Sequence, residues 1–211
     1  GDIYTVPSTG GRASQITTNP AHDTKPIWSP DGKKIAFASD RMGSMDIFEV
    51  NKEGGIPKRL TTHSGNETPV AYKDAGHILF LANIMPTAED AQFPSGQFQQ
   101  VYEVNTEGGR PVLFSSMPME DISINHTGNT LLYHDKKGYE DPWRKHHTSS
   151  ITRDIWLCSL NGNRTFRKQT AFNGEDRTPV WASDDKSFYY LSEEKGSFNI
   201  FKRDIDGNTS K

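Results

Sequence analysis

Cysteine is almost absent from this chain: Cys158 is the only one among 211 residues. A single thiol excludes a disulfide within the chain and any metal site made of several thiolates. Because Cys158 follows the apolar residues 155–157, we expect it to be a buried core residue. The fold must therefore rest on packing and hydrogen bonding, with no internal cross-link.

Hydrophobic residues are scarce as well, at 33% of the chain, whereas glycine and proline are frequent, with 18 and 12 copies. No apolar run approaches the roughly 20 residues of a membrane-spanning helix, so we expect no membrane span. Few apolar residues combined with many turn formers are typical of short strands joined by tight turns. The composition therefore favours an all-β fold.

An excess of one charge is lacking too, because 24 basic and 27 acidic side chains are interspersed and leave a net charge of −3. Nucleic-acid binding needs a basic surface. The basic pairs here, such as Lys33-Lys34, are short and lie in strand-like sequence, which indicates solvated strand faces. We expect no nucleic-acid partner and find no pattern that indicates a cofactor.

Internal repeats are the strongest feature that the sequence does contain. Four segments share a strand, a tight turn and a second strand: residues 26–37, 69–80, 121–133 and 179–190. Asp31-Gly32 in the first segment is a hairpin turn signal, because glycine accepts the positive φ that such a turn requires. Alternation with a period of two excludes stacked helical repeats.

A third strand follows each pair, and a short fourth strand follows a glycine turn. The third strand has five copies, at residues 2–6, 46–50, 101–104, 154–157 and 199–201. Each full unit is thus a four-stranded meander close to the roughly 40–50 residues of a propeller blade. We place a partial blade at residues 2–18 and four blades at about 24–62, 67–116, 119–171 and 177–208.

The unequal strand counts predict that the chain starts inside one blade and stops inside another. The last unit ends near residues 205–207, and we expect it to lack its fourth strand. The prediction is a β-propeller fragment of about four blades, an open or atypically closed arc of a six- or seven-bladed ring. Such an arc would expose blade edges, which allows self-association between copies.

Two sets of motifs resemble known propellers. The first repeat contains Trp28-Ser29-Pro30-Asp31-Gly32-Lys33, then Ser39-Asp40-Arg41 and the ending Leu60-Thr61. It is similar to the TolB-like (WD40-like) propeller repeat, which is specific for the fold and says little about function. Residues 138–150, with 153–156 and 174–180, resemble the amino-terminal propeller of tricorn-type serine peptidases. The resemblance covers essentially the whole chain and weakens at residues 73–76, which replace the usual Ser-Pro-Asp-Gly.

The resemblance implies a function without catalysis in this chain. In that family the catalytic serine and its partners lie in a carboxy-terminal peptidase domain, and the propellers are thought to guide and filter peptides. The implied role is a module that gates or guides peptides, with peptides or downstream peptidase domains of the same chain as partners. Bacterial members are commonly exported, which implies a periplasmic or envelope-associated location, whereas archaeal tricorn is cytosolic. The alternatives are a TolB-like protein-interaction scaffold of the cell envelope and the propeller of a prolyl-oligopeptidase relative.

The loops that enter first strands and those between second and third strands share one face of a propeller, because strands alternate in direction. The long, individual loops of this sequence all fall on that face, where function on a rigid scaffold usually lies. The segment 135–153 is basic and aromatic, which suits a peptide carboxylate or an acidic side chain. Its candidate binding residues are Trp143, Arg144, Lys145, His146 and His147.

That segment has a structural alternative, a loop held on a neighbouring blade by its own aromatics. A metal at His146-His147 is not expected, because adjacent side chains of an extended chain point apart. Residues 85–99 are either a lid or interface loop or a simple surface insertion.

Charged residues at the entries to the first strands form a second candidate set. They would surround the channel mouth and could meet a basic peptide or a cation; alternatively they cap strand-end amides or pair with neighbours. The members are Glu67, Glu120, Asp121, Glu175, Asp176 and Arg177. No serine lies in a Gly-x-Ser-x-Gly motif, so we expect no catalytic residue here. Aromatic residues recur at strand positions, and we expect them to pack between blades. They are Trp28, Phe37, Phe48, Phe80, Tyr102, Tyr133, Trp156, Trp181, Tyr190 and Phe201.

Overall fold

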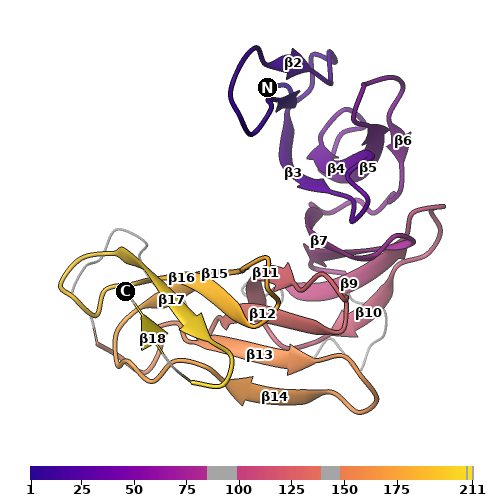
Figure 1. The fold of residues 1–211 in the computed structure, drawn as a ribbon. Coiled ribbons are helices and arrows are strands. Elements are labelled where there is room, and N and C mark those ends of the chain that lie inside the picture. Colours follow the sequence, from indigo (N-terminus) through magenta and orange to yellow (C-terminus); the bar gives the residue numbers. More distant parts are fainter. Residues whose placement is uncertain (85–98, 139–147, 208, 211) are drawn as a thin grey trace. The chain divides into compact units, whose positions relative to one another are not determined.

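The computed structural model describes residues 1–84, 99–138, 148–207 and 209–210. Every regular element in these residues is a β-strand, and the strands form one two-stranded and four four-stranded sheets (Figure 1). The chain divides into two units, Gly1–Met117 and Pro118–Lys211, and each is described by itself. The predicted all-β fold of about four four-stranded blades is confirmed. The open or atypically closed arc concerns the placement of the units and stays a prediction.

The first unit contains a short two-stranded sheet and two blades. β1 (Tyr4–Thr5) pairs with β2 (Ser14–Gln15). The first blade consists of β3 (Asp23–Trp28), β4 (Lys34–Ser39), β5 (Asp46–Asn51) and β6 (Lys58–Arg59). The second blade consists of β7 (Thr68–Asp74), β8 (His77–Ala82), β9 (Gln100–Asn105) and β10 (Val112–Ser115). Each strand pairs antiparallel with the next in sequence, so each blade is a simple meander.

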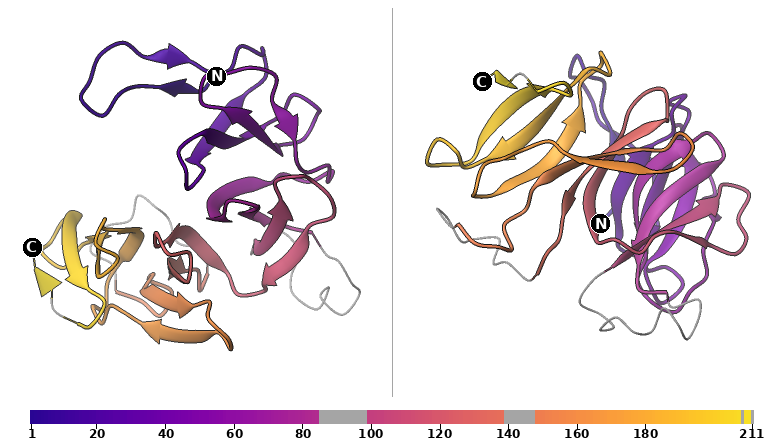
Figure 2. Two further views of the ribbon diagram at one scale, coloured as in Figure 1. Left: turned by 45° about the vertical axis from the view of Figure 1, so that its right-hand side comes forward. Right: turned by 90° about the horizontal axis from the view of Figure 1, so that it is seen from below.

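The second unit contains two blades with the same meander topology. The third blade consists of β11 (Met119–Ile124), β12 (Thr130–Asp135), β13 (Ile155–Ser159) and β14 (Thr165–Lys168). The fourth blade consists of β15 (Asp176–Trp181), β16 (Ser187–Ser192), β17 (Asn199–Asp204) and β18 (Thr209–Ser210). Figure 2 shows neighbouring strands of each blade side by side, with the twist usual for β-sheets.

The fourth strand of the last blade corrects the expectation that this blade would lack one. β18 pairs antiparallel with β17, with Lys202 opposite Ser210 and Arg203 opposite Thr209. A glycine turn makes the pairing possible, because Gly207 has a φ of 116° and its N–H donates to Asp204 O at 3.0 Å. Gly54 closes the corresponding turn of the first blade with a bond of 2.8 Å to Asn51 O.

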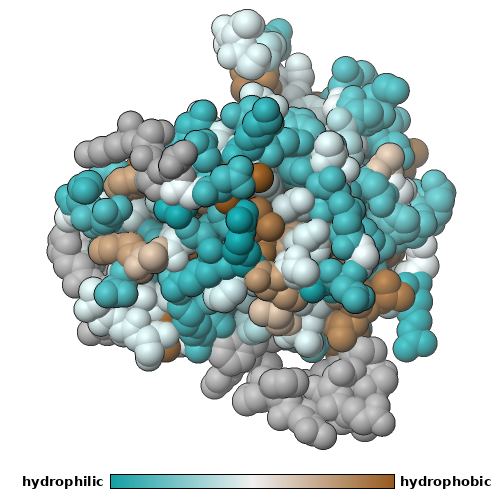
Figure 3. Space-filling model, turned by 60° about the horizontal axis from the view of Figure 1, so that its bottom comes forward, coloured by the Kyte–Doolittle hydropathy of each residue, from teal (hydrophilic) through white to brown (hydrophobic). Residues whose placement is uncertain are grey.

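The core of each unit lies between its blades. In the first unit, Ile47 and Leu60 of the first blade join Tyr72, Phe80 and Tyr102 of the second in one buried cluster. In the second unit, the buried cluster contains Leu132, Ile155, Trp181, Phe188, Tyr190 and Phe201. Most strand aromatics therefore pack between blades, as predicted, and Cys158 is buried as expected. The face of the molecule in Figure 3 is largely hydrophilic, with apolar residues scattered over it.

Trp28 departs from the predicted packing role, because it is 51% exposed. Its counterpart in the fourth blade is Trp181, since each lies opposite the start of a second strand, at Ile35 and Phe188 respectively. Trp181 is buried against the third blade and donates its Nε1–H to Ser123 O of β11 at 3.1 Å. The residues before β3 form the short strands β1 and β2.

None of the described residues form a helix with the length and apolar character needed to cross a membrane.

Candidate functional site

Three loops of the second unit lie at the same end of their blades, because antiparallel strands reverse direction at each turn. They connect β12 to β13, β14 to β15 and β16 to β17, and we call this end the loop face. Trp143, Arg144, Lys145, His146 and His147 belong to the first of these loops but lie outside the described residues, as do residues 85–98 of the first unit. Their binding role stays a prediction.

The strand register defines an equivalent position at the start of each first strand, which we call the lead-in position. Asp23 occupies it opposite Ser39, Asp176 opposite Ser192 and Met119 opposite Asp135. Glu67 precedes Thr68, which pairs with Leu81, and so takes the same position in the second blade. Glu120 and Glu175, which the sequence groups with these acids, lie one place after and one place before this position.

Glu67 is fully buried, with 0% exposure. Asp46 and Arg59, which pair at 2.8 Å, lie near enough to act on its charge. Burial raises the pKa of Glu67 to about 7, and the neighbouring Asp46 carboxylate adds to the rise. Neither oxygen of Glu67 has a hydrogen-bond partner of good geometry among the described residues. Glu67 is thus enclosed by its neighbours, and it lines neither of the two pockets described below.

Glu120 and Glu175 are both held by basic side chains of the second unit. Glu120 accepts from Lys136 at 2.7 Å and bonds His134 at 3.2 Å, and these contacts lower its pKa to about 2, the His134 hydrogen bond most strongly. Arg153 pairs with Glu175 at 2.5 Å and lies 3.7 Å from Glu120. The two acids thus join the third and fourth blades in one ionic network, and the partner of Glu175 is Arg153.

Asp121 and Arg177 are more accessible. Asp121 is exposed and accepts a hydrogen bond of 2.8 Å from the Thr178 hydroxyl of the next first strand. Asp121 and Thr178 both lie at β-bulges and have positive φ angles, 49° and 56°. A positive φ is unusual for a β-branched residue such as threonine. The guanidinium of Arg177 lies 4.1 Å from the centre of the Phe198 ring.

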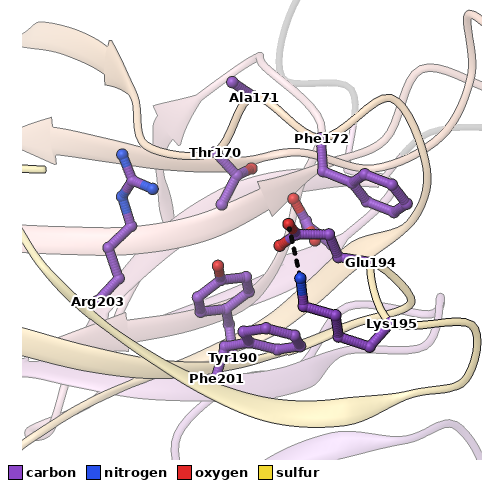
Figure 4. A pocket seen from close by; sticks show the side chains of 9 residues that line it. Thr170, Ala171, Phe172, Tyr190, Glu194, Lys195, Phe201 and Arg203 are labelled. Carbon is purple, nitrogen blue, oxygen red and sulfur yellow. Dashed lines mark ion pairs between the residues drawn. The ribbon is translucent and has the colours of Figure 1, made fainter. Parts of the chain in front are cut away.

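A pocket of about 520 Å³ lies between the third and fourth blades (Figure 4). Asp176 is one of the residues that line it. Asp176 is 1% exposed, and neither of its oxygens has a hydrogen-bond partner of good geometry among the described residues. Burial raises its pKa to about 6, against weak hydrogen bonds from Ser192 and Thr170, and the carboxylates of Asp154 and Glu194 raise it further. The other residues that line the pocket are Thr170, Ala171, Phe172, Tyr190, Glu194, Lys195, Phe201 and Arg203.

A second pocket, of about 330 Å³, opens on the loop face beside the first and shares Phe172 with it. Its charged residues already pair with one another: Lys168 contacts Asp154 at 2.9 Å, and Lys137 also bonds Asp154. Two lysines therefore neutralise Asp154, whereas no basic side chain of the described residues pairs with Asp176. Within the described residues, no three His, Cys, Asp or Glu side chains are grouped so that they could hold a metal ion.

Glu194, Lys195, Phe172 and Arg203 are pocket residues that the sequence analysis did not single out. A signal for Glu194 was present, because Ser192-Glu193-Glu194 takes the place in the fourth blade that Ser39-Asp40-Arg41 has in the first. Only an alignment of the ends of the second strands would have revealed that an arginine in one blade corresponds to a glutamate in another.

The blades are four-stranded antiparallel meanders that pack on one another through hydrophobic cores. The loops at one end of the blades differ from blade to blade. These features define a β-propeller module. The whole chain, residues 1–211, matches the model of the tricorn protease N-terminal β-propeller domain. The chain belongs to this family.

Individual relatives agree with the family. The chain is 24% identical over 208 residues to tricorn protease homolog 1 of Streptomyces coelicolor, and 26% identical over 216 residues to the tricorn protease homolog of Saccharolobus solfataricus. Each match covers 98% of this chain and 18% of the relative. The crystal structure of the tricorn protease has the same fold, with a TM-score of 0.72 and 20% identity over 98% of this chain and 20% of that one. The chain thus spans about a fifth of the length of these relatives.

Proposed function

We propose that this chain is a non-catalytic module that guides or gates peptides for a serine peptidase domain of its parent protein. The observation that carries the proposal is the family membership of the whole chain, whose similar relatives are named as tricorn proteases and are several times longer. The loop face supports it, because two pockets lined by charged and aromatic side chains lie on that face. Peptides carry charged and apolar groups, which such a surface can contact.

The test blocks one face of the second unit in the full-length parent. Ser197 is exposed on the loop face, between β16 and β17, and Asn161 is exposed at the opposite end, between β13 and β14. Each is replaced by cysteine, Ser197→Cys and Asn161→Cys, and coupled to a bulky polyethylene glycol maleimide. The native Cys158 is buried and should not react. Hydrolysis of a long unstructured peptide and of a tripeptide is then measured.

A gate or guide on the loop face predicts that the polymer at position 197 slows hydrolysis of the long peptide several-fold and that of the tripeptide much less. The polymer at position 161 should change neither rate. Equal effects at the two positions, or equal effects on the two substrates, would contradict the proposal.

A further inference from the structure

Asp176 of the fourth blade has a counterpart in the first blade, Asp23, and the first blade shows how an acid at this position is paired. In both blades the second strand ends in a serine opposite the lead-in aspartate, Ser39 in one and Ser192 in the other. The residue two places later donates its backbone N–H to that serine's Oγ, at 3.4 Å from Arg41 and 3.2 Å from Glu194. Arg41 and Glu194 therefore occupy equivalent positions in the same kind of loop.

Arg41 shows what the first blade places at this position. One nitrogen of its guanidinium, Nη2, donates to both oxygens of Asp23, at 2.9 and 3.0 Å. The group also lies 4.6 Å from the centre of the Phe48 ring and 5.4 Å from that of Phe37, distances typical of cation–π contacts. A buried carboxylate and a pair of aromatic rings thus form a complete guanidinium site, which the chain's own arginine fills.

The fourth blade has an aspartate and a pair of aromatic rings at the corresponding positions, but no arginine. Tyr190 lies opposite Phe201, as Phe37 lies opposite Phe48, and the two rings of the fourth blade are 5.8 Å apart. Glu194 replaces Arg41, which removes the cation and adds a second carboxylate. The pocket of about 520 Å³ is lined by Asp176, Tyr190, Glu194 and Phe201. These are the counterparts of Asp23, Phe37, Arg41 and Phe48 in the first blade.

The other two blades differ in a way that supports this comparison. In the second blade, Ile84 lies two places after the second strand and packs on the core cluster that contains Phe80 and Tyr102. In the third blade, Lys137 occupies this position, but Met119 replaces the lead-in acid, and the lysine bonds Asp154 instead. Among the four blades, the fourth combines a lead-in acid with an open pocket over the aromatic pair.

We propose that this pocket binds the guanidinium group of an arginine side chain of a peptide. The guanidinium would donate to Asp176 and lie over Tyr190 and Phe201, as Arg41 does in the first blade. Glu194 at the loop supplies a second negative charge. Guanidinium suits the site better than ammonium, because its planar fork can donate two bonds to one carboxylate and stack on a ring.

Two basic side chains also line the pocket, and their contacts are compatible with the proposal. Lys195 pairs with Glu194 at 3.7 Å and has a side chain that is 54% exposed (Figure 4). Arg203 interacts with the Tyr190 hydroxyl. Among the described residues, the charges that act on the pKa of Asp176 are both negative and come from Asp154 and Glu194.

The inference goes beyond the proposed function, because arginine binding by this chain requires no peptidase. The test is an NMR titration of the chain at pH 7.5 with N-acetyl-arginine methylamide, followed on the ring resonances of Tyr190 and Phe201. Tyr189, which is 42% exposed on the other face of β16, serves as the internal control. N-acetyl-citrulline methylamide, which has the shape of arginine without its charge, and the lysine analogue are titrated in parallel.

We expect the arginine compound to shift the Tyr190 and Phe201 signals and to leave Tyr189 unchanged. Loss of a charge-assisted hydrogen bond costs about tenfold in affinity, so the citrulline compound should bind at least that much more weakly. The lysine compound should lie between the two. Equal binding of arginine and citrulline, or shifts of Tyr189 of the same size, would overturn the proposal.

Two variants test the pocket itself. Asp176→Asn should weaken arginine binding by about tenfold or more. Glu194→Arg, at an exposed loop position, should fill the pocket as Arg41 does, abolish binding of the added arginine compound and raise the melting temperature. If Asp176→Asn fails to fold, Glu194→Arg still tests the proposal. Unchanged binding of the arginine compound to Glu194→Arg would show that the pocket is not the binding site.

Discussion

Glu67 should make the first unit less stable at neutral pH than at mildly acidic pH. The carboxyl is fully buried, and its pKa rises from the ordinary value of 4.5 to about 7, mainly through burial. A raised pKa means that the folded state binds the proton more tightly than the unfolded state. The contribution of Glu67 to the free energy of unfolding is therefore fully favourable below pH 4.5 and is lost as the pH rises through about 7. A rise of this size corresponds to at most about 3 kcal/mol between the two limits.

The variant Glu67→Gln removes the charge and keeps the shape of the side chain. We expect it to raise the free energy of unfolding by about 2 to 3 kcal/mol more at pH 8 than at pH 5. Urea unfolding followed by tryptophan fluorescence at both pH values measures the difference.

The matched control is Asp23→Asn, at the same lead-in position of the first blade. Because Arg41 pairs with Asp23 there, this substitution leaves a buried guanidinium without its carboxylate and should destabilise at both pH values. A Glu67→Gln effect that is the same at pH 5 and pH 8 would refute the reasoning that burial of the charge is costly.

Arg41, Glu120 and Cys158 each give a further test of the structure. Arg41→Ala should destabilise the first unit by about 3 kcal/mol, because it leaves the buried Asp23 carboxylate unpaired; a change below about 1 kcal/mol in urea unfolding would contradict the structural importance of this pair. The low pKa of Glu120, about 2, stabilises the second unit above pH 4.5, and this stability is lost as the pH falls through about 2. Glu120→Gln should therefore lower the urea midpoint at pH 6 and change it little at pH 2, and an equal loss at both would argue against the ionic network. Cys158, whose thiol is buried with a raised pKa, should react with Ellman's reagent only after unfolding, and fast reaction in native buffer would contradict its position.

The blades could be predicted from sequence because their signals are local. Period-two alternation and glycine turns such as Asp31-Gly32 depend on a few neighbouring residues, and they recur in each blade. β18 was missed because it has two residues and no apolar alternation of its own. Its presence depends on the turn at Gly207 and on pairing with β17. The exposure of Trp28 depends on which strand lies next to it, which the repeat pattern does not give.

The site was less predictable because it depends on register. The sequence grouped Glu120 and Glu175 with the other lead-in acids, but the strand pairing gives the lead-in position of the third blade to Met119. Whether an acid at the lead-in position forms an ion pair depends on the residue two places after the end of the second strand. That residue is far from the acid in the sequence. Asp23 has Arg41 there and Asp176 has Glu194, and only the folded blade brings each pair of positions together.

Peptide hydrolysis by the full-length parent and by residues 1–211 tests our proposal that this chain is a non-catalytic module of a peptidase. Each is assayed with and without a serine-directed inhibitor. We predict that the parent alone cleaves and that the inhibitor stops it. Cleavage by residues 1–211, or a parent that cleaves no peptide, would contradict the claim.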